Sequence, residues 1–394
     1  MKEICDRKKC TGCGACANIC PKECITMENN EFGEIFPVID NSKCINCKLC
    51  KENCPSINFI NLNYPIKAYA MWSSDETVYN NSASGGIATE LYRYALKKNW
   101  YIVGTQLMND FSVKFNVSNN DKYLSTYKNS KYTFSNMEYT PKYICKLLKD
   151  NNTVLFIGTG CQVAAIKQCT KNIKSGKLYL VDIVCHGMPP ANYLQEHIKD
   201  IQKKKRIQVD TCTFRNPQYG TDKFIFSLFN RKGETVYSKK PRSTDVYQLG
   251  YHFALIYREN CYNCFYACPE RSGDLTLSDY KAIGSKAPCD FEYGKISSVL
   301  VNTECGNELI KGIIDENRVI YHQRPIEEPI YGDAQLRHPS IPHQKRDYFL
   351  LQYKKGIGFE KAAKKALRKE RLVYASHYRE TKQWLKQRIK ALLP

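Results

Sequence analysis

Two cysteine runs with the same spacing stand near the start of the chain and are its most informative chemical feature. They are Cys10-x2-Cys13-x2-Cys16-x3-Cys20-Pro21 and Cys44-x2-Cys47-x2-Cys50-x3-Cys54-Pro55. A disulfide scaffold needs no repeated pair of x2 spacings, and a zinc ribbon uses four ligands rather than eight. The pattern therefore favours iron–sulfur clusters over either alternative.

This spacing is typical of bacterial ferredoxins with two 4Fe–4S clusters, in which the fourth cysteine of each run binds the other cluster. The first cluster is expected to be held by Cys10, Cys13, Cys16 and Cys54. The second cluster is expected to be held by Cys44, Cys47, Cys50 and Cys20. The sequence therefore predicts a protein that transfers electrons.

Four later cysteines could complete a third 4Fe–4S site. Cys161 and Cys185 follow predicted strands on tight turns, where side chains meet at the end of a parallel sheet. Cys261-x2-Cys264 has the spacing of adjacent metal ligands, and Cys268 is a rival because Cys264-x3-Cys268-Pro269 imitates the end of each ferredoxin run. Alternatively, several of these residues are small buried apolar side chains, as free cysteine often is.

Ser84-Gly85-Gly86 precedes a predicted helix with apolar residues at Ile87 and Leu91. Glycines let a backbone approach a phosphate, and the free amides of a helix N-terminus stabilise its charge. The same residues are also common as a simple helix cap, so the motif alone leaves both interpretations open.

The elements that must position these residues follow from the periodicity. Strand-like runs at 68–72, 100–105, 153–159 and 178–185 alternate with predicted helices, which indicates an α/β body with parallel strands. Residues 210–237 have a β-rich, hairpin-like pattern. The fold class is thus α+β or α/β: a small ferredoxin-like domain, an α/β body with a β-rich insertion, and a basic helical tail. The predicted domain limits are 1–60, 61–150, 151–335 and 336–394.

The tail carries much of the formal charge. Residues 351–394 hold 13 Lys and Arg against three Glu, about half of the net charge of +20. Two helices are predicted at 359–374 and 376–393, with an apolar stripe at Leu367, Trp384, Leu385, Ile389 and Leu392. This stripe could pack on the body, or the tail could dock an acidic protein or an anionic membrane surface. No nucleic-acid motif accompanies the charge, so nucleic acid is not an expected partner.

Cysteine usage and hydropathy together indicate the cellular compartment. The first nine residues leave no room for an apolar signal core before Cys10, and no apolar run approaches the roughly 20 residues of a membrane span. Twenty cysteines in so long a chain are then expected as thiolates in a reducing cytoplasm. Any membrane contact is expected to be peripheral.

Seven ordered motifs support a family resemblance. They are Ser82-Ala-Ser-Gly-Gly86, Ser130-Lys-Tyr132, Gly158-Thr-Gly-Cys-Gln162, Val184-Cys-His-Gly-Met-Pro189, Phe214-Arg215, Cys261-Tyr-Asn-Cys264 and Arg271-Ser-Gly-Asp-Leu-Thr-Leu-Ser-Asp279. Over residues 1–335 the chain resembles the coenzyme F-420 hydrogenase/dehydrogenase beta-subunit family, in the branch with its own N-terminal ferredoxin.

The resemblance implies an iron–sulfur flavoprotein with FAD next to an additional 4Fe–4S cluster. It assigns the extra cluster to Cys161, Cys185, Cys261 and Cys264, with Cys268 as runner-up. It places the flavin at Ser84, Gly85, Gly86, Thr89, Lys131, Thr159, Asp274 and Asp279.

The chain also departs from the family pattern. Gly160 stands where the family often has Pro, Ser278 where it often has Gly, and Tyr280-Lys281 where it commonly has Phe-Trp. The Cys-His-Gly form at Cys185 is unusual among deazaflavin-using members. It resembles a branch found among bacterial polysaccharide biosynthesis functions.

The expected function is a three-cluster FAD oxidoreductase that exchanges a hydride with an organic substrate, such as a sugar or nucleotide sugar. One alternative is a deazaflavin coenzyme F-420 oxidoreductase subunit, and another is a non-catalytic electron-carrier subunit. His186 could protonate the product or could orient the neighbouring cluster ligand. A ferredoxin-like or flavodoxin-like redox protein is the expected macromolecular partner.

Overall fold

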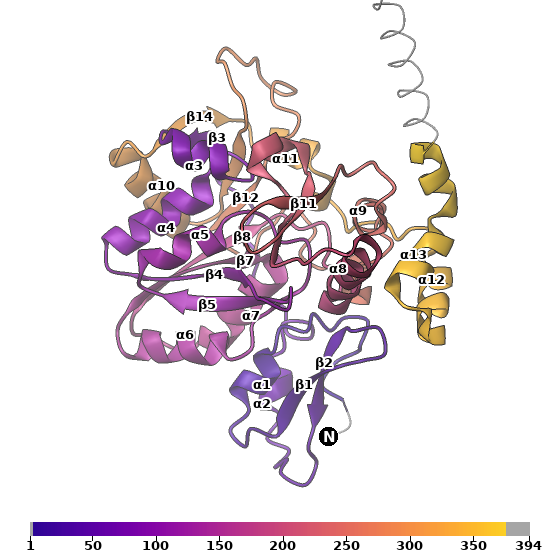
Figure 1. The fold of residues 1–394 in the computed structure, drawn as a ribbon. Coiled ribbons are helices and arrows are strands. Elements are labelled where there is room, and N and C mark those ends of the chain that lie inside the picture. Colours follow the sequence, from indigo (N-terminus) through magenta and orange to yellow (C-terminus); the bar gives the residue numbers. More distant parts are fainter. Residues whose placement is uncertain (1–2, 376–394) are drawn as a thin grey trace, which may run out of the picture.

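The computed structural model describes residues 3–375, and a large mixed sheet lies at its centre (Figure 1). Its strands are β3 (Lys67–Ser73), β4 (Tyr101–Leu107), β5 (Val113–Ser118), β6 (Ser135–Asn136), β7 (Thr153–Thr159), β8 (Lys177–Ile183), β12 (Leu275–Asp279), β13 (Ser297–Val301) and β14 (Val319–Arg324). Their order is β14-β3-β13-β12-β8-β7-β4-β5-β6.

The middle of this sheet has the parallel arrangement that the sequence predicts, whereas antiparallel pairs lie on both sides of it, β4 with β5 on one side and β3 with β13 and β14 on the other. Strands β12, β8, β7 and β4 are parallel neighbours, but β13 pairs antiparallel with both β12 and β3. Parallel strands need a crossover connection, usually a helix. Within the described residues no helix separates β12 from β13, so the chain returns antiparallel.

Helices cover both faces of the sheet, and strand β7 explains why. Its side chains alternate: Val154 and Phe156 join one apolar cluster, and Leu155 and Ile157 join another. The first face is covered by α6 (Thr140–Lys149) and α7 (Gly160–Thr170), and the second by α4 (Ile87–Lys97) and α10 (Glu304–Asp315). A strand buried on both faces has a continuous apolar run, as this one has from Val154 to Gly158.

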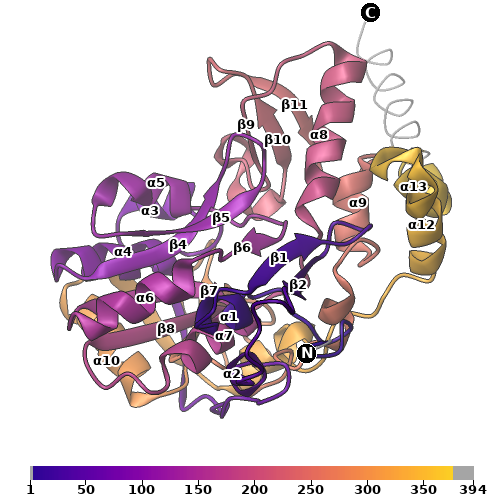
Figure 2. The same cartoon turned by 90° about the horizontal axis from the view of Figure 1, so that it is seen from below.

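The ferredoxin-like region packs beneath the sheet, next to α7 (Figures 1 and 2). It consists of α1 (Ala15–Ile19), β1 (Ile25–Asn29), β2 (Ile35–Ile39) and α2 (Leu49–Glu52), with β1 and β2 antiparallel. The segment that follows is tied down, because the backbone of Asn63 forms a β-bridge with Arg271. The segment between the ferredoxin-like region and the body is therefore part of the packed structure.

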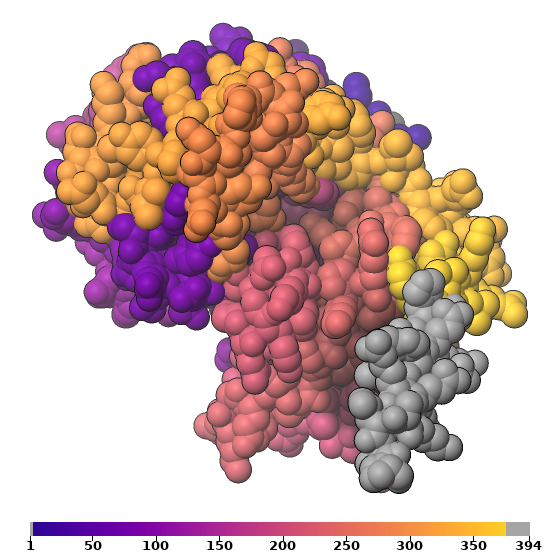
Figure 3. Space-filling model, turned by 90° about the horizontal axis from the view of Figure 1, so that it is seen from above, coloured from indigo at the N-terminus to yellow at the C-terminus, as the bar shows by residue number. Residues whose placement is uncertain are grey.

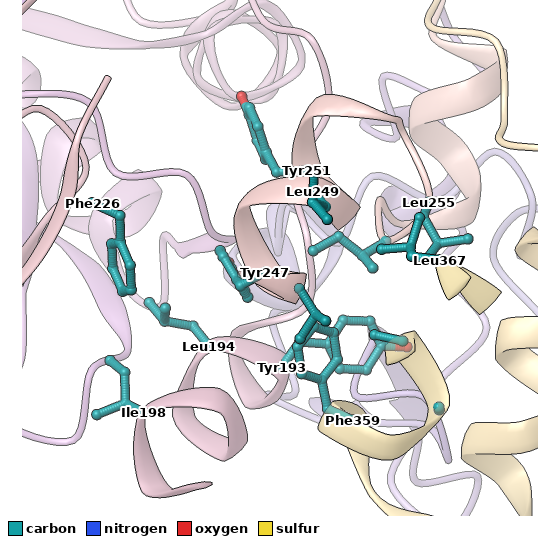
Figure 4. Close-up of a cluster of buried hydrophobic side chains, with 14 of the residues drawn as sticks. Tyr193, Leu194, Ile198, Phe226, Tyr247, Leu249, Tyr251, Leu255, Phe359 and Leu367 are labelled. Carbon is teal, nitrogen blue, oxygen red and sulfur yellow. The ribbon is translucent and has the colours of Figure 1, made fainter. Parts of the chain in front are cut away.

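A second apolar core lies beside the sheet (Figure 4). It is built by α8 (Ala191–Lys205), β9 (Thr211–Thr213), β10 (Phe226–Phe229), β11 (Thr235–Lys239), α9 (Val246–His252), α12 (Arg346–Gln352) and α13 (Phe359–Ala366). Phe359 of α13 is fully buried and stacks on Tyr193 of α8, with ring centroids 5.2 Å apart. The start of the basic tail thus packs on the body.

A buried ion-pair network also joins α13 to this core. His197 of α8 lies 3.0 Å from Asp245 and 2.9 Å from Glu360 of α13. Burial alone would lower the pKa of His197, but the two carboxylates outweigh it and raise the pKa to about 9. The predicted helix at 376–393, with Trp384, Leu385, Ile389 and Leu392, lies outside the described residues.

The remaining helical elements are shorter. They are α3 (Glu76–Asn81), α5 (Leu124–Tyr127), α11 (Glu327–Gly332), a π-helical turn at Tyr353–Ile357, and 3-10 turns at Asp121–Tyr123, Pro217–Tyr219, Thr221–Lys223, Glu259–Asn263 and Ala334–Leu336. Across residues 3–375, no helix is both long and apolar enough to cross a membrane. The predicted fold class, a mixed α/β body with a ferredoxin-like region and a helical C-terminal segment, is confirmed.

Candidate functional site

The first cysteine set, which consists of Cys10, Cys13, Cys16 and Cys54, comes together across the two runs. Burial raises the pKa of Cys13 to about 12, and the charges of Cys10 and Cys54 add to the rise. Burial likewise raises the pKa of Cys16 well above its usual range, with added repulsion from Cys13, Cys10 and Cys54. The fourth cysteine of the second run therefore lies beside the first run, as the interleaved pattern predicts.

The second cysteine set consists of Cys20, Cys44, Cys47 and Cys50, which together line one small pocket. Burial raises the pKa of Cys50, with further repulsion from Cys20 and Cys47. Cys47 is the exposed member of this set. The fourth cysteine of the first run thus lies among the thiols of the second.

Each of these sets has an additional thiol that sequence reasoning missed. The Sγ atoms of Cys24 and Cys20 are 3.4 Å apart, and Cys24 also interacts with Cys44. Cys5 forms side-chain hydrogen bonds with Cys10 and Cys54. The four-residue separation of Cys20 and Cys24 was the available signal, whereas Cys5 has no motif spacing.

The third cysteine set, which consists of Cys161, Cys185, Cys261 and Cys264, gathers from separate segments of the chain. Burial raises the pKa of Cys185 well above its usual range, with repulsion from Cys261, Cys161 and Cys264. Cys161 is the second residue of α7, and Cys185 follows β8. Cys261 lies in the 3-10 turn at Glu259–Asn263, and Cys264 ends it.

Cys268 stands apart from this set. Its Sγ donates to the carbonyl oxygens of Phe265 (3.4 Å) and Glu270 (3.2 Å). Burial raises its pKa, and the charged groups that act on it are Arg271, Glu270 and Asp182 rather than another cysteine. Cys268 therefore does not lie among the four cysteines of the third set.

No group of three or more His, Cys, Asp or Glu side chains in the described part of the chain is placed to hold one metal ion. A single zinc ion needs ligands that converge to about 2.0–2.3 Å from one point. The thiols of a four-iron cube stand further apart than those of a one-ion site.

A buried ion pair fixes the loops that carry the third set. Arg271 Nη2 lies 2.5 Å from Asp182 Oδ1 on β8, and Arg271 Nη1 donates to the carbonyl of Tyr266 at 2.9 Å. Gly273 N donates to Asp182 Oδ2 at 2.9 Å. Arg271 and Gly273 therefore join the end of the sheet to the segment that contains Cys261 and Cys264.

A cavity of about 560 Å³ opens at the C-terminal ends of the central parallel strands. This volume is within the usual range for ligand pockets. The wall includes Cys185 of the third set together with Pro241, His252, Lys281 and Asp333. Figure 3 shows a hollow in this region, between the salmon-coloured and orange segments.

Most of the predicted flavin residues border this cavity, and two do not. Those in the wall are Ser84, Gly86, Thr89, Lys131, Thr159 and Asp279. Asp274 lies at the far end of β12, where its carboxylate accepts hydrogen bonds from Leu180 N and Thr303 Oγ1. It holds the sheet together rather than facing the cavity.

Gly85 also does not line the cavity, and the reason why a glycine is needed at this position differs from the predicted one. A Cβ atom at Gly85 would lie 2.4 Å from the carbonyl oxygen of Met71 and 2.9 Å from Ser297 N. The Gly85 amide already donates to Ser297 Oγ at 3.0 Å. Close packing on β3 and β13, rather than approach to a phosphate, requires glycine at this position.

Several features of the wall fit a phosphate-bearing ligand. Helix α4 begins at Ile87 without a side-chain cap, so its first amides are available, and Gly86 has φ of 94°. Ser82 Oγ and Asn129 Oδ1 are buried in the wall, and neither has a hydrogen-bond partner among the described residues. Orphaned polar atoms beside an uncapped helix N-terminus suit an anionic, hydrogen-bonding group.

The basic residues that line the cavity include Lys131 and the buried Arg215. Burial lowers the pKa of Lys131 to about 7, and its Nζ donates to the carbonyl of Lys128 at 2.9 Å. Arg215 pairs with Asp279 at 2.5 Å and donates to the carbonyl of Ala83 at 2.7 Å. The Phe214-Arg215 motif contained this arginine, but its partner lies 64 residues away and could not be assigned from the sequence.

His186 lies in the cavity wall next to two ionisable groups. Its Nε2 is 3.5 Å from Lys281 Nζ and 3.9 Å from Asp333 Oδ1. Burial lowers the pKa of His186, and the Lys281 charge lowers it further. The side chain can therefore contact both a bound molecule and the adjacent Cys185 loop.

Comparisons with known protein families place the two parts of the chain. Residues 151–326 match the family that describes the C-terminal part of the beta subunit of coenzyme F420 hydrogenase/dehydrogenase, and residues 9–58 match the 4Fe-4S dicluster domain. Residues 151–326 therefore belong to this beta-subunit family and residues 9–58 form a two-cluster ferredoxin domain, which confirms the predicted resemblance. The chain is thus an iron–sulfur electron-transfer protein related to that beta subunit.

One similar solved structure comes from an F420-reducing NiFe hydrogenase complex of Methanosarcina barkeri, studied by xenon derivatization. The matched chain is 17% identical, with a TM-score of 0.42, over 79% of this chain and 92% of that chain. No curated protein matches the chain significantly.

Proposed function

We propose that this protein is an FAD-dependent iron–sulfur oxidoreductase with three 4Fe–4S clusters. The observation that carries the proposal is the position of Cys185, which belongs to the third cysteine set and also borders the cavity. A cluster held there would lie directly beside whatever the cavity binds. This is the arrangement that electron exchange between a cluster and a flavin requires.

The three sets form a continuous series from the outside inward. Burial raises the pKa of Tyr266, and the charges of Cys161 and Cys264 of the third set and of Cys13 and Cys54 of the first set add to the rise. The first and third sets therefore border the same side chain. The second set lies on the outer side of the first, and its exposed Cys47 suits electron entry from a ferredoxin-like or flavodoxin-like donor.

Within the cavity, the N-terminus of α4, Ser84, Thr89 and Lys131 would hold the phosphates and ribityl chain of FAD. When bound, FAD exchanges single electrons with iron–sulfur clusters and a hydride with an organic partner. The Arg215–Asp279 pair would fix the opposite wall. Asp274 and Gly85 are not included in this proposed site.

His186 and Lys281 lie where an organic substrate would enter, and we assign them to its orientation by hydrogen bonding. A sugar or nucleotide sugar remains the expectation for this substrate. The deazaflavin coenzyme F420 is the alternative that the family description favours. A cytoplasmic location, with peripheral membrane contact through the basic tail, completes the proposal.

Cofactor analysis followed by reoxidation kinetics tests this function. Anaerobically purified protein should contain about one FAD and about 12 iron per chain, since each cluster has four. After reduction, candidate acceptors are added while flavin absorbance is followed, and coenzyme F420 is one of them. Complete iron with no bound flavin would contradict the proposal and favour an electron-carrier subunit.

A further inference from the structure

Arg258 is a buried cation in the interface between the ferredoxin-like region and the body. Its side chain donates from Nη1 to the carbonyl of Thr11 at 2.5 Å and from Nη2 to the carbonyl of Ile35 at 3.1 Å. A Cβ atom at Gly12 would lie only 2.7 Å from Arg258 Nη2. The guanidinium therefore enters the first cysteine run itself, at the glycine between Cys10 and Cys13.

Arg258 forms no ion pair with any carboxylate in the described part of the chain, whereas the neighbouring Arg346 pairs with Glu259 at 3.1 Å. Arg258 is 2% exposed, and its guanidinium lies 4.5 Å from the centre of the Phe134 ring. Among residues 3–375 its Nε has no hydrogen-bond partner. A buried cation is costly unless it is paired.

The Arg258 charge acts on cysteines of two sets, because it favours the thiolate form of Cys10 in the first set and of Cys161 and Cys261 in the third. The Arg258 backbone also contacts the third set, since Cys261 N donates to the Arg258 carbonyl at 3.0 Å. An oxidised 4Fe–4S cluster with four thiolate ligands carries a charge of about −2. Clusters held by these two sets would therefore supply the negative charge that Arg258 needs.

We propose that Arg258 is the shared counter-ion of the first and third clusters and raises the reduction potential of both relative to the second. Reduction makes a cluster more negative, so a nearby cation stabilises the reduced form more than the oxidised form. Electrons that enter at the second cluster would then be drawn toward the body. For the third cluster this proposal rests on the proposed function, whereas for the first cluster it does not.

The experiment is an anaerobic redox titration of the full holoprotein, followed by electron paramagnetic resonance. Arg258→Gln removes the charge and keeps a hydrogen-bonding side chain. We expect the equilibrium constant for reduction of the first cluster to fall at least tenfold, which lowers its potential by about 59 mV or more for a one-electron couple. The second cluster should keep its potential. An unchanged first-cluster potential, or an equal shift of all clusters, would overturn the proposal.

Arg346→Gln is the matched control, because it removes a buried guanidinium from the same interface, and Arg346 is not among the main charges that act on Cys10, Cys13 or Cys16. We expect this variant to leave the potential of the first cluster unchanged. If Arg258→Gln loses iron, Arg258→Lys should retain the first cluster and most of its potential. Loss of iron in both Arg258 variants, but not in Arg346→Gln, would show that the hydrogen bonds of Arg258 rather than its charge retain the cluster. That result would also overturn the proposal.

Iron content separates this proposal from the proposed function. A parent protein with about 8 iron per chain would lack the third cluster and so contradict the proposed function. The first-cluster titration remains interpretable in that case. An intact parent with about 12 iron and no effect of Arg258→Gln would reject the counter-ion alone.

Discussion

The third cysteine set makes a quantitative prediction for Cys261→Ala. Because Cys161, Cys185, Cys261 and Cys264 surround one another, removal of one thiol should release a whole cluster rather than a single iron. The iron content should fall from about 12 to about 8 per chain. The change should leave the ferredoxin-like region intact, since its eight cysteines lie in a different segment of the chain.

The matched control is Cys268→Ala, which removes a cysteine from the same segment whose Sγ contacts backbone carbonyls. This variant should keep about 12 iron per chain. Iron and acid-labile sulfide are measured anaerobically after reconstitution, and electron paramagnetic resonance counts the reduced clusters. A loss of about four iron from Cys268→Ala together with full iron in Cys261→Ala would refute our grouping of the ligands.

Three further predictions concern the cavity and the second apolar core. Burial lowers the pKa of Lys131 to about 7, so flavin should be retained more tightly at pH 6 than at pH 8, and Lys131→Met should abolish this difference in equilibrium dialysis. Phe359→Ala should lower the free energy of unfolding by about 3–5 kcal/mol in urea titrations. The exposed Leu372→Ala should change it by less than about 0.5 kcal/mol. Because its two carboxylate partners raise the pKa of His197 to about 9, its stabilising effect should be complete below about pH 6.5 and lost as the pH rises through 9. An unfolding free energy with the same pH profile in His197→Gln would contradict this reasoning.

The sequence was most informative where chemistry depends on local spacing. The two ferredoxin runs predicted the interleaving of Cys20 and Cys54 because a short x2 spacing leaves little freedom in how three thiols surround a cluster. Cys268 could not be separated from the third set in this way. Its x3-Cys-Pro context imitates that of a cluster ligand. In the structure, Arg271 binds the Cys268 carbonyl at 3.1 Å and holds this segment in place.

Features that depend on distant contacts were not predictable. Arg258 has no motif, and its partners Thr11 and Ile35 lie 247 and 223 residues away in the sequence. The glycine at position 85 suggested a phosphate loop, but the sheet residues that require it come from β3 and β13. Periodicity predicted a helix from Phe359, whereas its burial against α8 depends on a tertiary contact with Tyr193.

The ferredoxin-like region is fixed to the body, and this bears on how electrons move. Tyr266 Oη donates to the carbonyl of Pro55 at 3.3 Å, directly after the first-set ligand Cys54. Gln168 Nε2 donates to the carbonyl of Asn58 at 2.8 Å, and Glu34 accepts a hydrogen bond from Glu259 N at 2.9 Å. These contacts join the ferredoxin-like region to the body close to Cys54 and to the turn that carries Cys261, so folding sets the distance between the first and third cysteine sets. If the third set holds a cluster, as we propose, electron transfer between the two clusters would need no domain movement.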